Sequence, residues 1–363
     1  MTSNEYIEAL YRLLFNRPPD PKGLHHWSEF IAHGSNPMDV LQAFLVSEEY
    51  LRRNGESEPE SLRTTVIHGA KKILRGRPLF IVDVGAQILD WEDHIYQPLI
   101  ASDVSCEVLG FEPLAHRLRE RAVKEKNVSL TLLPYAIGDG KPHTLHVNND
   151  DGTSSLYPLN PEASRNLEGL DTLHTVRTER VATRRLDDVL PQRPVHFLKL
   201  DIQGFELRAL EHAVDTLFRT AVVHCEVEFY PLYVGQPLFP QVHNFLTVHG
   251  FEFIDLVKPT RLSPAVPSGR KGPERLVFAD AVFFRKCQPH ERELLQVQAM
   301  IALLVYQKPV LAEALLRQCE FGVPPEFASA GVQKSHEAPT RSLQRYGGHN
   351  APPRATAQSA IHL

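Results

Sequence analysis

The stretch LFIVDVGA, residues 79–86, decides the fold class, because it joins a short apolar run to an acidic residue and a glycine. Such a run is typical of a strand that is buried on both faces of a parallel sheet. Similar runs follow at 107–111, 130–134, 196–200, 221–227, 251–257 and 276–284, and helical patterns separate most of them. This alternation predicts an α/β domain with a doubly wound sheet.

The N-terminal residues predict a different, all-α unit. Apolar residues recur at helical spacing in three short segments before residue 46. Asp20-Pro21 and Asn36-Pro37 combine an N-cap residue with a proline suited to a first helical position. We therefore expect a small helical domain over residues 1–53.

The rest of the chain divides by composition. Residues 54–78 predict a polar linker followed by a helix, and residues 79–288 the α/β domain. Residues 289–322 predict a C-terminal helical extension. Residues 323–363 have few large apolar side chains, and this composition predicts disorder.

Composition and charge exclude several classes. The net charge is −5 and there is no basic stripe, so we expect no nucleic-acid partner. No apolar run is long enough for a membrane span. The four cysteines stand apart without a Cys-x-x-Cys pair, and no His-Glu-x-x-His occurs, so no metal site is expected. Isolated thiols fit a reducing compartment, which predicts a cytoplasmic location.

The turn after the first strand indicates the kind of ligand. In an open α/β sheet, ligands bind at the carboxyl ends of the strands, at the switch point. A dinucleotide site needs several glycines there, but this turn has only Gly85, together with Asp83, Asp90, Glu92 and Asp93. Carboxylates repel a pyrophosphate and suit a cation. The turn therefore favours S-adenosylmethionine, a sulfonium, over NAD, with an ordinary strand-to-helix turn as the alternative.

The next two strands end in residues that suit the rest of such a ligand. Glu112 follows the second strand and can accept hydrogen bonds from both ribose hydroxyls, and Pro113 can begin the next helix. Ala136 and Ile137 offer an apolar step for an adenine face. The alternative for that segment is a hairpin turn at Gly138-Asp139-Gly140 before a strand at 143–147.

The string KLDIQGFE, residues 199–206, is the most specific of the chain. Strand period two places Lys199 and Asp201 on one face, at the strand end. Glu226 and Glu228 share a face at the end of the following strand. We expect Asp201 to act as the catalytic base, oriented by Lys199, with Glu226 as the alternative base. A Lys–carboxylate pair that only braces the loop, and metal assistance by Asp201 with Glu226, are the competing interpretations.

Together these strings resemble the FkbM-type methyltransferases, class I enzymes that use S-adenosylmethionine. The resemblance covers about residues 79–286 and rests on seven strings in order: 83–86, 111–113, 136–139, 152–155, 181–188, 199–206 and 226–230. It implies a Rossmann-like seven-stranded sheet with helices on both faces and an antiparallel final strand at 280–285. It also implies methyl transfer to a hydroxyl oxygen, often on a sugar, glycan or secondary metabolite.

The resemblance assigns a role to each string. It implies cofactor contacts from Asp83, Gly85, Ala86, Glu112, Pro113, Ala136 and Ile137. It implies a small-molecule or glycan acceptor near Ser154, Ser155 and Glu228, beside Asp201, Lys199 and Glu226.

Residues 1–53 resemble the short helical DUF4214 domain, through the strings 6–11, 16–27 and 47–50. This implies docking to a protein partner rather than catalysis.

The FkbM pattern usually has a second glycine where this chain has Leu89. A side chain that closes the cofactor pocket would leave a catalytically inactive scaffold, which is the alternative function.

Overall fold

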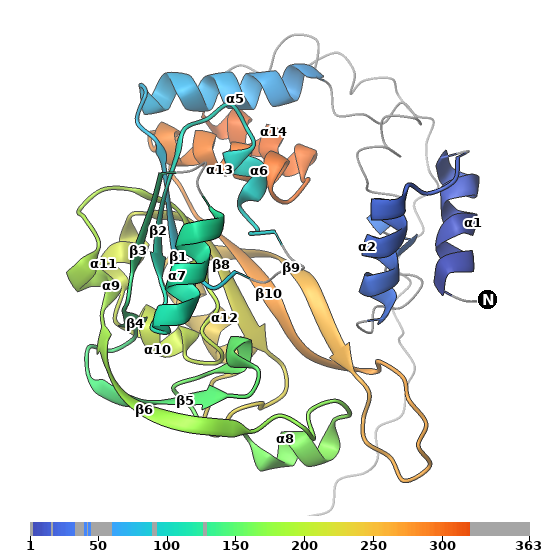
Figure 1. Ribbon diagram of the computed structural model, residues 1–363. Helices are drawn as coiled ribbons and strands as arrows, with labels where there is room; N and C mark the ends of the chain where they lie inside the picture. Colours follow the sequence, from blue (N-terminus) through green and yellow to red (C-terminus); the bar gives the residue numbers. More distant parts are fainter. Residues whose placement is uncertain are drawn as a thin grey trace, which may run out of the picture. The chain divides into compact units, whose positions relative to one another are not determined.

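The largest element is a seven-stranded mixed sheet (Figure 1). The computed structural model describes residues 3–15, 17–32, 40–41, 43–44, 60–88, 93–125 and 129–319. The strands of this sheet are β1 (Leu79–Val84), β2 (Cys106–Phe111), β3 (Ser129–Leu133), β7 (Val195–Leu200), β8 (Thr220–Glu228), β9 (Phe251–Leu262) and β10 (Arg275–Arg285). Their order is β3-β2-β1-β7-β8-β10-β9, and β10 runs antiparallel to both of its neighbours.

This order confirms the predicted α/β sheet with an antiparallel final strand, although that strand begins at Arg275 instead of Asp280. All six residues of β1 are buried, as expected for a strand covered on both faces. The order reverses between β1 and β7, which are paired in parallel. That reversal is the switch point at which ligands bind in such folds.

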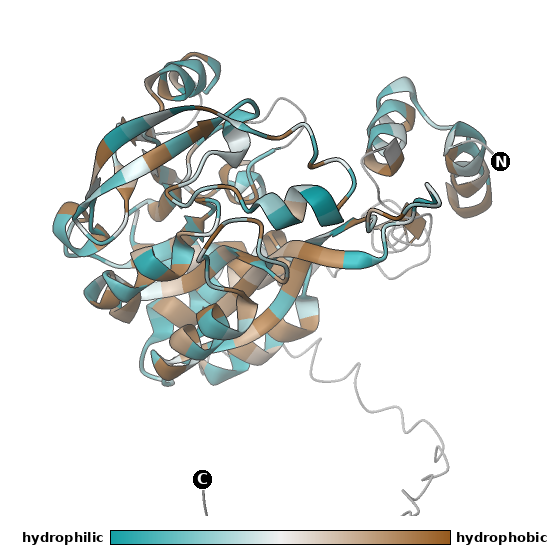
Figure 2. Cartoon of the chain, turned by 90° about the horizontal axis from the view of Figure 1, so that it is seen from below, coloured by the Kyte–Doolittle hydropathy of each residue, from teal (hydrophilic) through white to brown (hydrophobic). Residues whose placement is uncertain are grey.

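Helices cover both faces of the sheet. Because parallel crossovers are right-handed, the connections on the two sides of the switch point lie on opposite faces. The helices of the α/β domain are α5 (Glu60–Leu74), α6 (Gln97–Ile100), α7 (Ala115–Lys124), α8 (Pro161–Asn166), α9 (Leu186–Val189), α10 (Glu206–Glu211), α11 (Val214–Phe218), α12 (Phe239–Val248), α13 (Arg292–Leu304) and α14 (Pro309–Gln318). In Figure 2, apolar residues gather in the strands of the large sheet and on the helices beside it.

A second, three-stranded sheet lies in the connection between β3 and β7. It consists of β4 (Ala136–Ile137), β5 (Pro142–Asn148) and β6 (Thr175–Arg184), in the order β4-β6-β5. The strand predicted at 143–147 is present as β5. The alternative hairpin is wrong, because β4 and β5 do not pair with each other and β6 lies between them. Most of β6 is exposed and polar, so no apolar run revealed it.

The N-terminal helices are α1 (Ser3–Phe15) and α2 (Pro21–Ala32). They enclose a small core of Ile7, Leu10, Tyr11, Phe15, Val40 and Phe44. The Asp20 carboxylate accepts a hydrogen bond from the Gly23 amide at 2.9 Å, so Asp20 is an N-cap, as predicted. Most of the third predicted helix, the linker and the predicted disordered tail lie outside the described residues. Within the described part, no helix has the length and apolar character needed to cross a bilayer.

Candidate functional site

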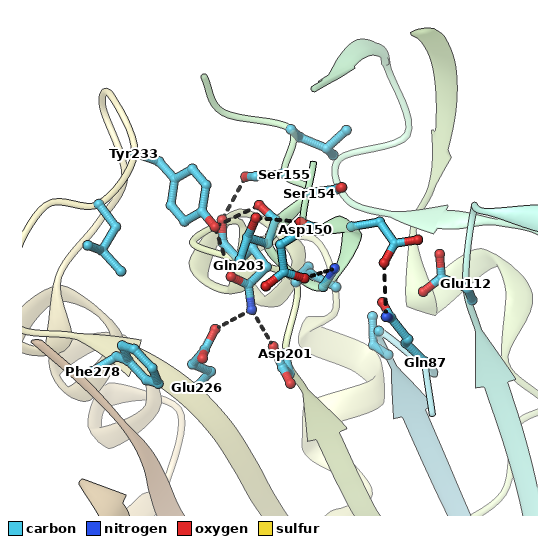
Figure 3. Close-up of a pocket in the computed structure, with 18 of the residues that line it drawn as sticks. Gln87, Glu112, Asp150, Ser154, Ser155, Asp201, Gln203, Glu226, Tyr233 and Phe278 are labelled. Atoms are coloured by element: carbon cyan, nitrogen blue, oxygen red, sulfur yellow. Dashed lines mark hydrogen bonds between the residues drawn. The ribbon is translucent and has the colours of Figure 1, made fainter. Parts of the chain in front are cut away.

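A cavity of about 470 Å³ opens at the carboxyl ends of β1, β2, β7 and β8, across the switch point. Figure 3 shows Glu112 and Gln87 at one end, Phe278 and Tyr233 at the other, and Asp201 between them. Most of the predicted site residues line this cavity: Gly85, Glu112, Pro113, Ala136, Ile137, Ser154, Ser155, Lys199, Asp201, Glu226 and Glu228.

Asp83 and Ala86 do not line the cavity. Asp83 is completely buried below the turn, where its Oδ2 accepts hydrogen bonds from Tyr96 and Arg121, both at 2.6 Å. Burial alone would raise the pKa of Asp83, but Lys199 and Arg121 together lower it well below its usual value. Asp83 is therefore held in a buried ion pair with Arg121, and its predicted contact with the cofactor stays a prediction.

The backbone of the first turn approaches the loop after β7 closely. Gly85 has φ +77°, and a Cβ at this position would lie 1.8 Å from the Asp201 carbonyl oxygen. Nζ of Lys199 donates to the Gly85 carbonyl at 2.8 Å. A glycine is therefore required here to bring the two loops together at the cavity. Leu89, Asp90 and Glu92, which belong to the same predicted turn, lie outside the described residues.

Glu112 stands at the end of β2, with Oε1 accepting the Leu114 amide hydrogen at 2.8 Å. Burial raises the pKa of its carboxyl group to about 7, although the Leu114 hydrogen bond opposes the shift. Ala136 and Ile137 are buried beside it in β4. The predicted acid and the predicted apolar step therefore face the same end of the cavity.

Asp201 occupies the middle of the cavity, and its carboxylate is held from two directions. Nζ of Lys199 lies 3.4 Å from Oδ2, and the side-chain amide of Gln203 donates to Oδ1 at 2.9 Å. The Asp201 side chain remains 36% exposed, whereas that of Lys199 is only 16% exposed. The carboxylate is thus oriented by the protein and still reachable from the cavity.

Gln203 links this carboxylate to its surroundings. The same amide nitrogen donates to Oε2 of Glu226 at 3.0 Å, and the Tyr233 hydroxyl lies 2.8 Å from Oε1 of Gln203 (Figure 3). Gln203 adopts φ +59°, a left-handed conformation unusual for a residue with a side chain. The turn therefore carries local strain that its hydrogen bonds offset.

Glu226 and Glu228 lie two residues apart at the end of β8. Burial first, and then neighbouring carboxylates, raise the pKa of both groups well above the usual value. Asp201 contributes most among the charges acting on Glu226, and Glu206 most among those acting on Glu228. Both side chains therefore favour the protonated form more than an exposed glutamate does. No metal-binding group of three or more His, Cys, Asp or Glu occurs among the described residues.

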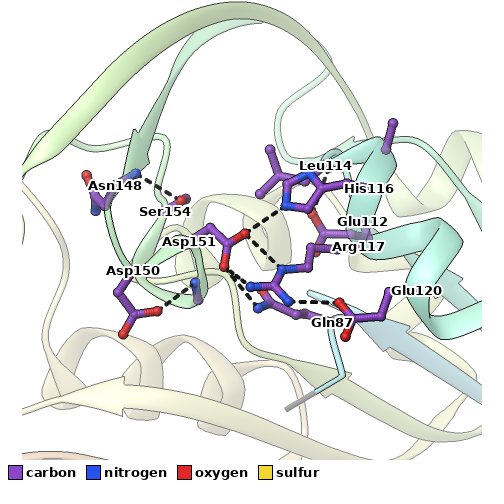
Figure 4. A network of polar contacts seen from close by, with 12 residues as sticks. Gln87, Glu112, Leu114, His116, Arg117, Glu120, Asn148, Asp150, Asp151 and Ser154 are labelled. Atoms are coloured by element: carbon purple, nitrogen blue, oxygen red, sulfur yellow. Dashed lines mark hydrogen bonds and ion pairs between the residues drawn. The ribbon is translucent and has the colours of Figure 1, made fainter. Parts of the chain in front are cut away.

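The segment around Ser154 and Ser155 lines the cavity, and Figure 4 shows its neighbour Asp151 in a polar network with His116 and Arg117. The Ser155 hydroxyl donates to the Gln203 carbonyl at 2.6 Å, and the Ser154 hydroxyl accepts the Asn148 amide hydrogen at 3.1 Å. Asp151 accepts hydrogen bonds from the Arg117 guanidinium of α7. The serines are thus tied into the protein, and their predicted contact with substrate stays a prediction.

Sequence reasoning missed several residues that complete the site. No sequence pattern marked Arg121 and Arg117, because Asp83 and Asp151, to which they donate, are distant in the sequence. Gln203 stands inside the quoted 199–206 string, but strand periodicity assigned it no role. Tyr233 lies seven residues after Glu226, beyond the end of β8, where no pattern marked it.

Comparison with known families agrees with this geometry. Residues 83–253 match the model of the methyltransferase FkbM domain, and residues 1–54 match the domain of unknown function DUF4214. These matches confirm both predicted resemblances. The first also confirms the predicted enzyme class, the S-adenosylmethionine-dependent methyltransferases. No match to a curated protein sequence was found.

Several solved structures are similar over most of their length. Magnesium protoporphyrin IX methyltransferase from Synechocystis PCC 6803, with bound SAM, is 8% identical, with 79% of this chain and 98% of that chain covered and a TM-score of 0.31. A precorrin-6y C5,15-methyltransferase from Geobacter metallireducens is 14% identical, with 62% and 89% covered and a TM-score of 0.29. The N-terminal domain of EvdMO1, in the presence of SAH and D-fucose, is 10% identical, with 64% and 86% covered and a TM-score of 0.29.

Proposed function

We propose that this FkbM-type domain transfers the methyl group of S-adenosylmethionine to a hydroxyl oxygen of a sugar, glycan or secondary metabolite. The observation that carries the proposal is the placement of Asp201. Its partly exposed carboxylate, held by Lys199 and Gln203, lies in a cavity that extends to both sides of the switch point. One side is available for the methyl donor and the other for the acceptor.

The residues at the β2 end fit the donor. Glu112 offers a carboxyl group to the ribose hydroxyls, and Ala136 and Ile137 an apolar surface to the adenine. The cavity lining holds two lysines and eight carboxyl-bearing residues: Asp93, Glu112, Asp150, Asp151, Asp201, Glu226, Glu228 and Asp280. Burial raises the pKa of some of these carboxyl groups, but the balance still favours a cationic ligand over a pyrophosphate.

Bound S-adenosylmethionine supplies an electrophilic methyl group on a sulfonium. The chain's own residues supply the acceptor chemistry. Asp201 accepts the proton of the acceptor hydroxyl as the new carbon–oxygen bond forms. Lys199 and Gln203 fix the direction of that carboxylate. Burial and neighbouring carboxylates raise the pKa of Glu226 and favour its protonated form, so we assign it a hydrogen bond to the acceptor rather than the role of base.

The test is methyl transfer from labelled S-adenosylmethionine to hydroxyl compounds from a host lysate, with donor binding measured separately by calorimetry. Asp201→Asn should abolish transfer and keep donor affinity within about two-fold, because Asp201 acts on the acceptor. Asp215→Asn, on the exposed surface of α11, is the matched control and should leave both unchanged. Normal turnover by Asp201→Asn would contradict the assignment.

The same calorimetry separates the alternatives. Binding of NAD in place of S-adenosylmethionine would indicate an oxidoreductase. Binding of neither ligand would favour the inactive scaffold, which docks through its N-terminal helices. A protein partner for those helices and a cytoplasmic location remain predictions.

A further inference from the structure

The two ends of the cavity differ in chemistry. The end at β1 and β2 combines polar groups, among them Gln87, Glu112 and Asp151, with a small apolar step at Ala136 and Ile137. The opposite end carries a larger apolar surface beside the carboxyl groups of β8 and β10. We call this surface the apolar wall, and it consists of Leu159, Ala163, Leu170, Leu173, Leu232 and Phe278. Figure 3 shows Phe278 and Glu112 on opposite sides of Asp201.

The apolar wall comes from three segments that hold one another in place. The Asn160 amide donates to the Leu232 carbonyl at 2.8 Å, and the Val234 amide to the Pro158 carbonyl at 2.9 Å. The Phe229 amide donates to the Val277 carbonyl, next to Phe278, at 2.8 Å. The wall is therefore a preformed surface, and a ligand binds to it without the cost of ordering a loop.

The side chains of this wall are partly accessible rather than sealed. Leu170, Leu232 and Phe278 pack against buried Ala163 and Leu167, yet each keeps part of its surface in the cavity. Carbon surface that faces water in a concave site favours a ligand that removes that water.

The polar neighbours of the wall are mostly occupied. Asn160 uses its side chain to donate to the Pro231 carbonyl at 2.7 Å and to accept the Glu162 amide hydrogen at 3.0 Å. Asp280 lies 3.2 Å from Nε2 of His224. Ser164 and Thr260 line the same end and add polar atoms beside the carbon surface. The surface thus suits an amphipathic molecule better than a plain sugar.

From this arrangement we propose that the apolar wall binds a hydrophobic group of the methyl acceptor, carried close to the hydroxyl that is methylated. The inference rests on the proposed function, because it places the acceptor on the Phe278 side of Asp201. The acceptor class is then a hydroxyl compound with an attached alkyl or aromatic group, such as a glycoside with an apolar aglycone. An unsubstituted oligosaccharide would leave the wall facing water.

The test compares octyl β-glucoside with methyl β-glucoside, which share their hydroxyl groups and differ in apolar length. Binding of each to the full chain is measured by calorimetry in the presence of S-adenosylmethionine. We expect the octyl compound to bind at least about ten-fold more tightly. Equal affinities, including no measurable binding of either compound, would overturn the proposal.

Variants locate the effect on the wall. Leu170→Asn, which has the same number of side-chain heavy atoms, should remove most of the octyl preference, whereas the volume-conserving Leu170→Met should keep it. Val176→Asn, at an exposed position of β6 outside the cavity lining, is the second control and should also keep the preference. An octyl preference that survives Leu170→Asn in a folded protein would contradict the assignment. If Leu170→Asn does not fold, Leu173→Asn takes its place.

This experiment separates the inference from the proposed function. Methyl transfer is assayed in parallel with the same two glucosides and with other hydroxyl acceptors. If no acceptor is methylated, the proposed function is contradicted. The ratio of the affinities for octyl and methyl β-glucoside then still tests whether the apolar wall binds an alkyl group. Transfer without an octyl preference would sustain the proposed function and overturn the inference.

Discussion

The guanidinium of Arg121 donates a hydrogen bond to the carboxylate of Asp83 at 2.6 Å, and neither side chain reaches solvent. Arg121 also donates to the Ala86 carbonyl at 3.0 Å. The acidic residue of the first turn is thus part of a buried ion pair that fixes the turn to α7. Its effect on a ligand is indirect, through the position of Gly85.

We expect Asp83→Asn to destabilise the fold. Removal of one partner leaves the buried Arg121 charge with only Glu125, 3.1 Å from its Nε, as counter-charge, which costs about 3 kcal/mol. Urea unfolding followed by circular dichroism measures this loss. Glu211→Gln, in the exposed pair with Arg208, is the control and should cost less than about 1 kcal/mol. Normal stability with lost donor binding would instead show a direct cofactor contact by Asp83.

Asp201→Asn and Glu226→Gln should differ in their effect on catalysis. Loss of a general base lowers kcat by about 100-fold or more. Burial and neighbouring carboxylates raise the pKa of Glu226 and favour its protonated form, which a glutamine side chain resembles. We therefore expect Glu226→Gln to keep most of its activity. Steady-state kinetics with any acceptor that the lysate screen yields decides between the two, and a larger loss in Glu226→Gln would make Glu226 the base.

Gln203→Gly should separate activity from stability. Glycine adopts φ +59° without strain, and relief of a left-handed conformation is worth about 1–3 kcal/mol, which offsets the lost side-chain hydrogen bonds. The Asp201 carboxylate would lose the amide that orients it, so we expect kcat to fall about ten-fold. Donor affinity should not change.

Gln307→Gly is the matched control, because exposed Gln307 has φ +52° and does not line the cavity. It should leave kcat unchanged. Equal kcat values for Gln203→Gly and the wild type would show that Gln203 does not position Asp201.

Donor affinity should rise with pH through neutrality. The pKa of Glu112 is about 7, raised by burial, and ribose hydroxyls donate hydrogen bonds to the ionised form. Binding therefore favours ionisation, and the affinity for S-adenosylmethionine should increase between about pH 6 and about pH 8. Calorimetry in two buffers of different ionisation enthalpy would detect the released proton. Glu112→Gln should remove both effects, and a pH dependence that persists in this variant would assign it to another group.

The free energy of unfolding should fall as pH rises. Glu226 and Glu228 have pKa values above those of the unfolded chain, because they are buried next to other carboxylates. Their contribution to stability is complete below about pH 4 and is lost as pH rises through the folded-state values. Thermal unfolding between about pH 5 and about pH 8 measures the slope, and Glu226→Gln combined with Glu228→Gln should flatten it. An unchanged slope would contradict the raised values.

Much of the fold follows from local sequence. β1 and β7 are buried apolar strands. They could be predicted as strands because nearly all of their side chains lie in the core, whichever strand pairs with them. The pairing of Lys199 with Asp201 follows from strand periodicity alone. The end of a parallel strand also fixes where Glu112 and Glu226 lie, and both line the predicted cavity.

Other features depend on contacts between distant segments. Arg121 lies on a helix that also carries Arg117, Arg119, Glu120 and Lys124, and nothing in its own neighbourhood shows that it reaches Asp83. β6 carries alternating polar residues and is recognisable only through its partners β4 and β5. The role of Gln203 depends on a left-handed turn that brings its amide between two carboxyl groups.

The place of β10 in the sheet has a consequence for synthesis of the chain on the ribosome. β10 pairs with β8 on one side and with β9 on the other, yet it is the last strand to be translated. Until residue 285 has left the exit tunnel, the edge of β8 that pairs with β10 is open. A nascent chain that holds every residue from the first turn to Glu228 therefore still exposes an unpaired strand edge beside the site, which favours edge-to-edge aggregation.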